Sequence, residues 1–182
     1  MSYAGVRERT REEYGWLFRG RTFEDEPHHR RRVENTKRLI SRFYTGGTVL
    51  DVGWGSYPLA YEVAKGDYLG LDFLFHHRGF PLVEAIVGDF DHLPFQREPL
   101  FDFILWCEGP EHSRNPRETL KGLREICRGR ILITCPPSSP VNWEHLTTIR
   151  DKAELERLLS RYFKVLEIGD VPPFWIYGVG EV

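Results

Sequence analysis

Four carboxylate side chains stand at intervals along the sequence, each at or just after the end of a short apolar run. They are Asp51, Asp72, Asp89 and Glu108. One acid in such a position is usually a turn or helix-cap residue, but four in succession indicate a repeated arrangement of strand and acid. Ligands of open α/β sheets bind at the carboxyl ends of the strands. These carboxylates are therefore candidates for hydrogen bonds to a ligand.

A glycine turn follows the first of these acids. The run 48–52 has the pattern of a buried strand and breaks at Gly53 and Gly55. Glycine adopts backbone angles that are closed to other residues and lets a ligand approach the main chain. We expect a helix from Pro58 to about Lys65, because proline is favoured at a first helical position. Its N-terminal amides would point at the turn.

A second group of residues could take a proton from a substrate. Glu108, Glu111 and His112 lie close together after the fourth apolar run, and His145 lies in the loop after the fifth. A helical turn would place Glu108 and Glu111 on one side. A positioned carboxylate or imidazole can act as a general acid or base. These residues are the predicted catalytic residues.

The rest of the pattern supplies the elements that would position these side chains. Strands are expected at residues 48–52, 68–72, 85–89, 101–108, 130–135, 163–168 and 174–179. Helices are expected at residues 28–43, 58–65, 116–127 and 152–162, where apolar residues recur at helical spacing. The stretch 91–99 has no helical pattern, so the crossover between the third and fourth strands should be short.

The glycine turn resembles motif I of the class I S-adenosylmethionine (SAM)-dependent methyltransferases, an acidic residue followed by GxGxG. The stretches 68–72, 85–90 and 101–107 resemble later motifs of that family, in the family's order. The resemblance covers roughly residues 46–170 and is specific for the cofactor rather than for the substrate. It implies a Rossmann-like three-layer α/β/α sandwich. Its mostly parallel seven-stranded sheet would have an antiparallel last strand.

The resemblance also implies the cofactor, SAM, with S-adenosylhomocysteine (SAH) as the product. In the family, the carboxylate at the position of Asp72 binds the ribose hydroxyls. The acid at the position of Asp89 lies near the adenine amino group, and the residue after it packs on the base. The implied cofactor-binding residues are Asp51, Gly53, Gly55, Asp72, Phe73, Asp89, Phe90 and Trp106.

Two departures from known patterns define the alternatives. Tyr57 stands where motif I has its third glycine, which leaves open a non-catalytic relative that serves as a binding or scaffolding protein. A NAD-dependent oxidoreductase is less favoured, because Pro58 occupies the third glycine position of the dinucleotide fingerprint GxGxxG. The acid at the strand end, Asp51, is also typical of methyltransferases.

The turn that contains Glu108, Glu111 and His112, together with a distant histidine, has a further resemblance. It is similar to the magnesium-binding set of the methyltransferases that act on the 3′ ends of small RNAs, and to quinone-pathway O-methyltransferases. A divalent metal is thus compatible with the site, but the sequence alone predicts none and assigns no metal ligands. The methyl acceptor stays unidentified and could be RNA, protein or a small metabolite.

The composition is that of a globular protein. The chain has 182 residues, of which 41% are hydrophobic and 29% charged, as is typical of globular domains. We expect one unit, made of an N-terminal arm and helix (residues 1–45) and a methyltransferase domain (residues 46–182). The polar start is unlike a signal peptide and no apolar run reaches membrane-spanning length, so a cytoplasmic protein without a membrane partner is expected.

No insertion long enough for a substrate lid is visible after the fifth strand or between the last two strands. The site is therefore open, which suits a large substrate such as RNA or protein, or it is closed by the N-terminal arm or by the second subunit of a homodimer. In the arm, Tyr14, Trp16 and Arg19 either cover the bound cofactor and substrate or pack on the outside of the domain.

Overall fold

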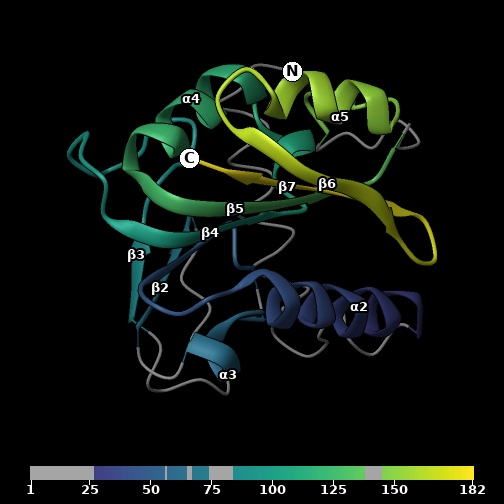
Figure 1. Ribbon diagram of the computed structural model, residues 1–182, viewed down its shortest axis with the longest axis horizontal. Helices are drawn as coiled ribbons and strands as arrows, with labels where there is room; N and C mark the ends of the chain where they lie inside the picture. The colour runs from purple at the N-terminus through teal and green to yellow at the C-terminus, as the bar shows by residue number, and fades with distance from the viewer. Residues whose placement is uncertain (1–26, 56, 65–66, 74–83, 138–144) are drawn as a thin grey trace.

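The structure is a three-layer α/β/α sandwich (Figure 1). It is a computed structural model that describes residues 27–55, 57–64, 67–73, 84–137 and 145–182. The strands are β1 Val49–Val52, β2 Tyr68–Asp72, β3 Glu84–Val87, β4 Phe101–Cys107, β5 Cys127–Cys135, β6 Lys164–Val171 and β7 Trp175–Glu181. The helices are α2 Pro27–Phe43, α3 Tyr61–Ala64, the 3₁₀ turn η2 Pro110–His112, α4 Pro116–Ile126 and α5 Lys152–Leu159.

The sheet has the strand order β3-β2-β1-β4-β5-β7-β6. Strands β1 to β5 are parallel, whereas β7 runs antiparallel to its neighbours β5 and β6. This arrangement confirms the predicted mostly parallel sheet with an antiparallel last strand. From β1 the chain adds β2 and β3 on one side, and then crosses to add β4 and β5 on the other side. The place between β1 and β4 where the direction changes is called the switch point, and ligands of such sheets bind there, outside the carboxyl ends of the strands.

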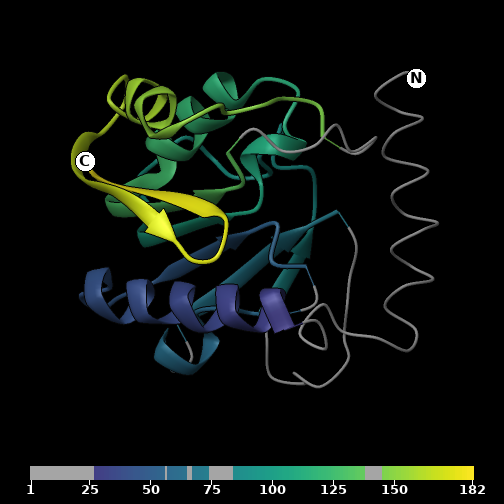
Figure 2. The same ribbon diagram turned by 90° about the vertical axis from the view of Figure 1, so that its right-hand side faces the viewer.

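Both faces of the sheet are covered, as Figure 2 shows, by α2 and α3 on one side and by α4 and α5 on the other. All residues of β1 are buried. Leu50 packs into the core cluster that includes α4 and α5, and Val49 packs into the one that includes α2. Burial on both faces explains why the central strands have near-continuous apolar runs.

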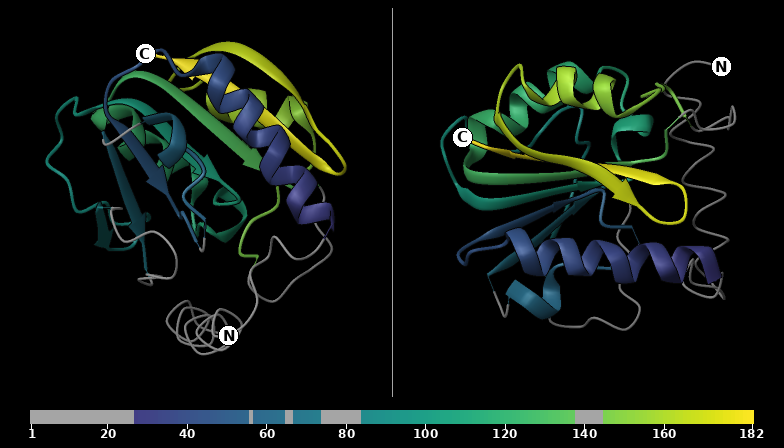
Figure 3. Two further views of the ribbon diagram at one scale, coloured as in Figure 1. Left: turned by 90° about the horizontal axis from the view of Figure 1, so that it is seen from below. Right: turned by 45° about the vertical axis from the view of Figure 1, so that its right-hand side comes forward.

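Helix α2 extends along the β6–β7 hairpin (Figure 3). Asn35 donates a hydrogen bond to the Pro172 carbonyl at 3.0 Å, and Arg42 pairs with Glu167 at 2.6 Å. The helix buries Ile40 and Phe43 against the sheet. The N-terminal helix thus packs directly on the C-terminal hairpin and belongs to the same core.

Several element boundaries differ from the prediction, and three of the differences concern helices. The helix expected at Pro58 begins at Tyr61, because residues 57–60 form successive tight turns. Cys127, expected to end a helix, starts β5. Helix α5 ends at Leu159. The predicted arm residues Tyr14, Trp16 and Arg19 lie outside the described residues, and none of the described helices has the length and apolar character needed to cross a membrane.

Asp102 in β4 forms hydrogen bonds to the residues at the starts of β1 and β5. Its carboxylate accepts hydrogen bonds from the Thr48 amide at 2.8 Å and from the Arg128 guanidinium at 2.7 Å. The Arg128 guanidinium, with help from Thr48, holds the pKa of Asp102 well below its ordinary range. The ionised form therefore stabilises the folded chain.

We predict that Asp102→Asn lowers the free energy of unfolding by about 1 to 2 kcal/mol at pH 7. Because the folded-state pKa is lowered, the contribution of Asp102 is present above its unfolded pKa of about 3.9 and is lost as the pH falls below that value. Urea unfolding of both proteins from pH 7 to pH 3 measures this. A difference that stayed constant below pH 4 would contradict the assignment.

Candidate functional site

The glycine turn and the end of β2 meet at the carboxyl edge of the sheet. The amide of Gly55 donates a hydrogen bond to Asp72 Oδ2 at 2.8 Å, and the amide of Gly53 donates to the Leu71 carbonyl at 2.7 Å. Both glycines have positive φ, +71° at Gly53 and +58° at Gly55, which glycine adopts without strain. The two sequence motifs that were predicted to bind a cofactor are thus joined by a direct hydrogen bond.

A third predicted motif lies against the same turn. A Cβ atom added to Gly53 would lie 3.8 Å from the Phe90 ring. Phe90 is buried and packs edge-on against Trp106, with 6.2 Å between the ring centroids. Asp89 directly precedes Phe90 in the sequence, and Phe73 directly follows Asp72. Both side chains are partly exposed. Gly53, Gly55, Asp72 and Phe90 are therefore neighbours at this edge.

Trp106 is less suited to a ligand contact. It lies inside β4 and is fully buried in the cluster that includes α4 and α5. In this structure it supports Phe90 from the core side and has no exposed surface. Its predicted contact with a cofactor stays a prediction.

Asp51 lies beneath the glycine turn and holds it in place. Its side chain is buried, and it accepts hydrogen bonds from the Tyr68 hydroxyl at 2.9 Å and from the Leu59 amide. Burial raises the pKa of Asp51 to about 7, against the lowering effect of these two hydrogen bonds. The Leu59 amide, expected to face a ligand from a helix start, is thus already engaged by Asp51.

Tyr57 lies beside α2. Its hydroxyl accepts a hydrogen bond from Lys37, whose ammonium lies 4.6 Å from the centroid of the Tyr57 ring and also pairs with Glu62 at 3.0 Å. The tyrosine that replaces the third glycine of motif I thus packs toward the helical layer. This position removes the main reason to expect that Tyr57 blocks a ligand.

The four predicted catalytic residues divide into two groups. Glu108 Oε1 accepts a hydrogen bond from Thr134 at 3.2 Å, and Oε2 accepts one from the Trp175 indole and lies 3.6 Å from Arg32. Glu108 also has a positive φ of 53°, which is uncommon for a residue other than glycine. The Glu108 carboxylate thus connects β5, β7 and α2. It is not part of the cluster that the other three predicted catalytic residues form.

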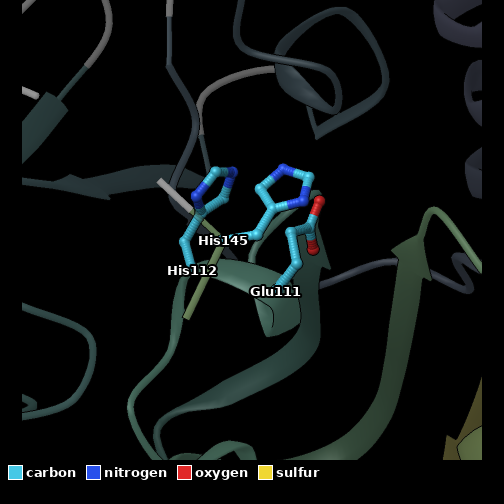
Figure 4. Close-up of side chains that lie close together, drawn as sticks. All are labelled: Glu111, His112 and His145. Carbon is cyan, nitrogen blue, oxygen red and sulfur yellow. The ribbon is translucent and has the colours of Figure 1, made fainter. Parts of the chain in front are cut away.

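Glu111, His112 and His145 form the second group (Figure 4). One potential ligand atom from each lies within 4.8 Å of the others, and the two imidazole centroids are 5.0 Å apart. Glu111 is buried, whereas both histidines are partly exposed. The predicted convergence of a glutamate and two histidines from different loops is therefore present in the structure.

The sequence analysis missed Asp91, which fixes the chain directly after His112. The Asp91 carboxylate accepts hydrogen bonds from the hydroxyls of Ser113 at 2.5 Å and Thr119 at 2.7 Å, and from the Arg114 amide at 3.0 Å. Ser113 is fully buried. An Asp that follows a strand-end acid by two residues gives no separate signal, because its partners come from a segment more than twenty residues away.

We predict that Asp51→Asn removes a pH dependence of stability. Because the folded-state pKa of Asp51 is raised, its contribution is fully present below the unfolded pKa and is lost as the pH rises from about 4 through about 7. Between pH 4 and pH 8 the stability difference should shift in favour of the variant by roughly 2 to 4 kcal/mol. This shift is independent of any fixed cost of placing an amide beside the Leu59 N–H.

Chemical unfolding at several pH values measures this shift in the stability difference. The matched control is Asp102→Asn, because folding lowers the pKa of Asp102 whereas it raises the pKa of Asp51. A difference that does not change with pH would show that Asp51 is ionised in the folded chain at pH 4.

Comparison with known proteins gives the fold of the chain a name. No protein-family model matches the sequence, and no curated protein sequence does either. Among solved structures, 1,6-didemethyltoxoflavin-N1-methyltransferase of Burkholderia thailandensis, crystallised with SAH, superposes with a TM-score of 0.76 at 17% identity, covering 98% of this chain and 88% of that chain. Magnesium protoporphyrin IX methyltransferase of Synechocystis, with SAM bound, superposes at 0.73 and 12% identity, covering 100% and 97%.

The N-methyltransferase NodS of Bradyrhizobium japonicum superposes at 0.66 and 14% identity, covering 87% of this chain and 98% of that chain. All three are methyltransferases, and the similarity extends over most of each chain. The chain has the class I SAM-dependent methyltransferase fold.

Proposed function

We propose that this chain is a SAM-dependent methyltransferase that binds SAM at the carboxyl edge of β1, β2 and β3. The observation that carries the proposal is the hydrogen bond from the Gly55 amide to Asp72, at 2.8 Å. This hydrogen bond joins the motif I turn to Asp72, the last residue of β2, near the switch point of the sheet. Two of the similar structures were crystallised with SAM or SAH.

The assigned roles follow from the chemistry of the cofactor. Asp72 accepts hydrogen bonds from the ribose hydroxyls, and Asp89 binds the adenine amino group. Phe90 and Phe73 provide apolar surface for the adenine ring. Gly53 and Gly55 let the methionine end approach the main chain, and Asp51 supports the turn from below.

Methyl transfer is an in-line displacement. The acceptor's nucleophilic atom bonds to the methyl carbon while the carbon–sulfur bond breaks, and the sulfur keeps the electron pair and loses its positive charge. The protein mainly holds nucleophile, carbon and sulfur in line, an orientation effect that contributes several kcal/mol. If the acceptor atom carries a proton, the group formed by Glu111, His112 and His145 is the proposed place of its removal. The acceptor itself is RNA, protein or a small metabolite.

The alternatives are not favoured. The non-catalytic reading rested on Tyr57, and the contact of that side chain with Lys37 weakens it. The oxidoreductase reading is disfavoured by Pro58 and by Asp51. Thermal shifts with NADH against SAM separate the two cofactor classes, because only a cofactor that binds the folded chain raises its unfolding temperature.

We predict that SAH binds the purified full chain at one site per chain and that Asp72→Asn weakens this binding about 10- to 100-fold, as expected for lost hydrogen bonds to a charged group. Asparagine keeps an oxygen that can accept from the Gly55 amide, so the turn should survive. It loses the negative charge and one of the two acceptors that a ribose diol needs. Isothermal titration calorimetry measures both proteins.

The matched control is Asp170→Asn, which removes an exposed carboxylate paired with Lys152 and should bind SAH as the wild type does. The proposal fails if folded wild-type protein gives no binding at millimolar SAH. Equal affinity of Asp72→Asn and wild type would refute the role of Asp72.

A further inference from the structure

Glu111, His112 and His145 form a cluster with the composition and spacing of a metal site. Their potential ligand atoms lie within 4.8 Å of one another. A metal with bonds of about 2.0 to 2.2 Å holds its donors roughly 3 to 4 Å apart, so small side-chain rotations complete the geometry. We propose that these three residues bind a divalent transition-metal ion, Zn²⁺.

The donor types decide between candidate ions. Two imidazole nitrogens and one carboxylate oxygen match sites for zinc and similar transition metals. Magnesium prefers oxygen ligands and dehydrates reluctantly. The cluster therefore differs from the magnesium site considered from the sequence, which would also have used Glu108.

Glu108 is kept from the cluster by its own contacts. Its two carboxylate oxygens already face Thr134, the Trp175 indole and Arg32. Moving it toward His112 would strand the partly buried Arg32 without its carboxylate, and an uncompensated charge of this kind is costly. Among the described residues, the site therefore has three protein donors, which leaves coordination positions for water or for a substrate atom, as in catalytic zinc sites.

The two segments that supply the donors are fastened to each other by the backbone. The amides of Leu146 and Thr147 both donate to the Glu111 carbonyl, at 2.7 and 3.1 Å, and the Thr147 hydroxyl donates to the Ser113 carbonyl at 2.7 Å. His145 is thereby held beside Glu111 and His112 before any metal binds. A preorganised donor set binds more tightly because less ordering is needed.

The burial of Glu111 supports a cation at this point. It is only 3% exposed, so a cation bound there would lie beside a carboxylate shielded from water, where their attraction is strong. The partly exposed histidines leave the ion reachable from solvent.

The catalytic role of the ion rests on the proposed methyltransferase function. The binding of the ion to Glu111, His112 and His145 does not depend on that function. A divalent ion lowers the pKa of a hydroxyl bound to it. The hydroxyl proton then leaves to solvent, and the resulting oxygen attacks the methyl carbon of SAM. This chemistry suits an acceptor that is methylated on oxygen.

Titration of the metal-free full chain with ZnCl₂, MnCl₂ and MgCl₂, without SAM, tests the proposal. We expect one Zn²⁺ per chain and affinities for Mn²⁺ and Mg²⁺ at least about tenfold weaker. Co²⁺ bound at the same site should give visible absorption bands of an imidazole-coordinated ion. His112→Ala and His145→Ala should each weaken Zn²⁺ binding by about tenfold or more and change the Co²⁺ spectrum.

Glu111→Gln keeps the volume of the buried side chain and serves as the variant that should fold normally, with the same loss of affinity. His92→Ala, which removes an exposed histidine elsewhere on the chain, is the matched control and should leave binding unchanged. Zinc binding unaffected by the three site variants would overturn the proposal, as would Mg²⁺ binding as tight as Zn²⁺ or no binding at all. SAH titration of the same samples is separate, so failure of the cofactor site and failure of the metal site are distinguishable.

Discussion

The carboxyl ends of five parallel strands must lie at one edge of a sheet, and the rest of this structure depends on that constraint. Each strand from β1 to β5 delivers its last residues to this edge, and the reversal of order between β1 and β4 separates the loops there. The hydrogen bond from Gly55 to Asp72 then joins the first two loops. Residues from separate motifs thereby meet at this edge.

Three aspartates illustrate how position in the same sheet decides what a carboxylate does. Asp102 lies at the amino end of β4, where an arginine keeps it ionised and it ties strands together. Asp51 lies inside β1, where burial favours its protonated form and it supports a turn. Asp72 is at the end of β2 and receives a main-chain amide from the glycine turn. Only the last is proposed to contact the ligand directly.

The sequence predicted the sheet well because its central strands are apolar on both faces and end in acids and glycines. The long amphipathic helix α2 and the antiparallel last strand were also confirmed. The short helix α3 was predicted too early, because Pro58 is favoured at a helix start but residues 57–60 are drawn into turns by the bond between the Leu59 amide and Asp51. That bond depends on the tertiary placement of a buried carboxylate, which local pattern does not report.

The same limit applies to the site. The convergence of Glu111, His112 and His145 was anticipated from residue types, since each follows a parallel strand. The separation of Glu108 was not, because it depends on Arg32 in α2 and Trp175 in β7. Asp91 was missed for a similar reason.

A crystal structure of the full chain grown with saturating SAH would test the proposed cofactor site most directly. We predict SAH at the carboxyl edge of β1 to β3, with its ribose hydroxyls on Asp72, its adenine beside Phe90 and its sulfur facing the cluster of Glu111, His112 and His145. SAH bound elsewhere, or no SAH at this edge at saturating concentration, would contradict the proposed site.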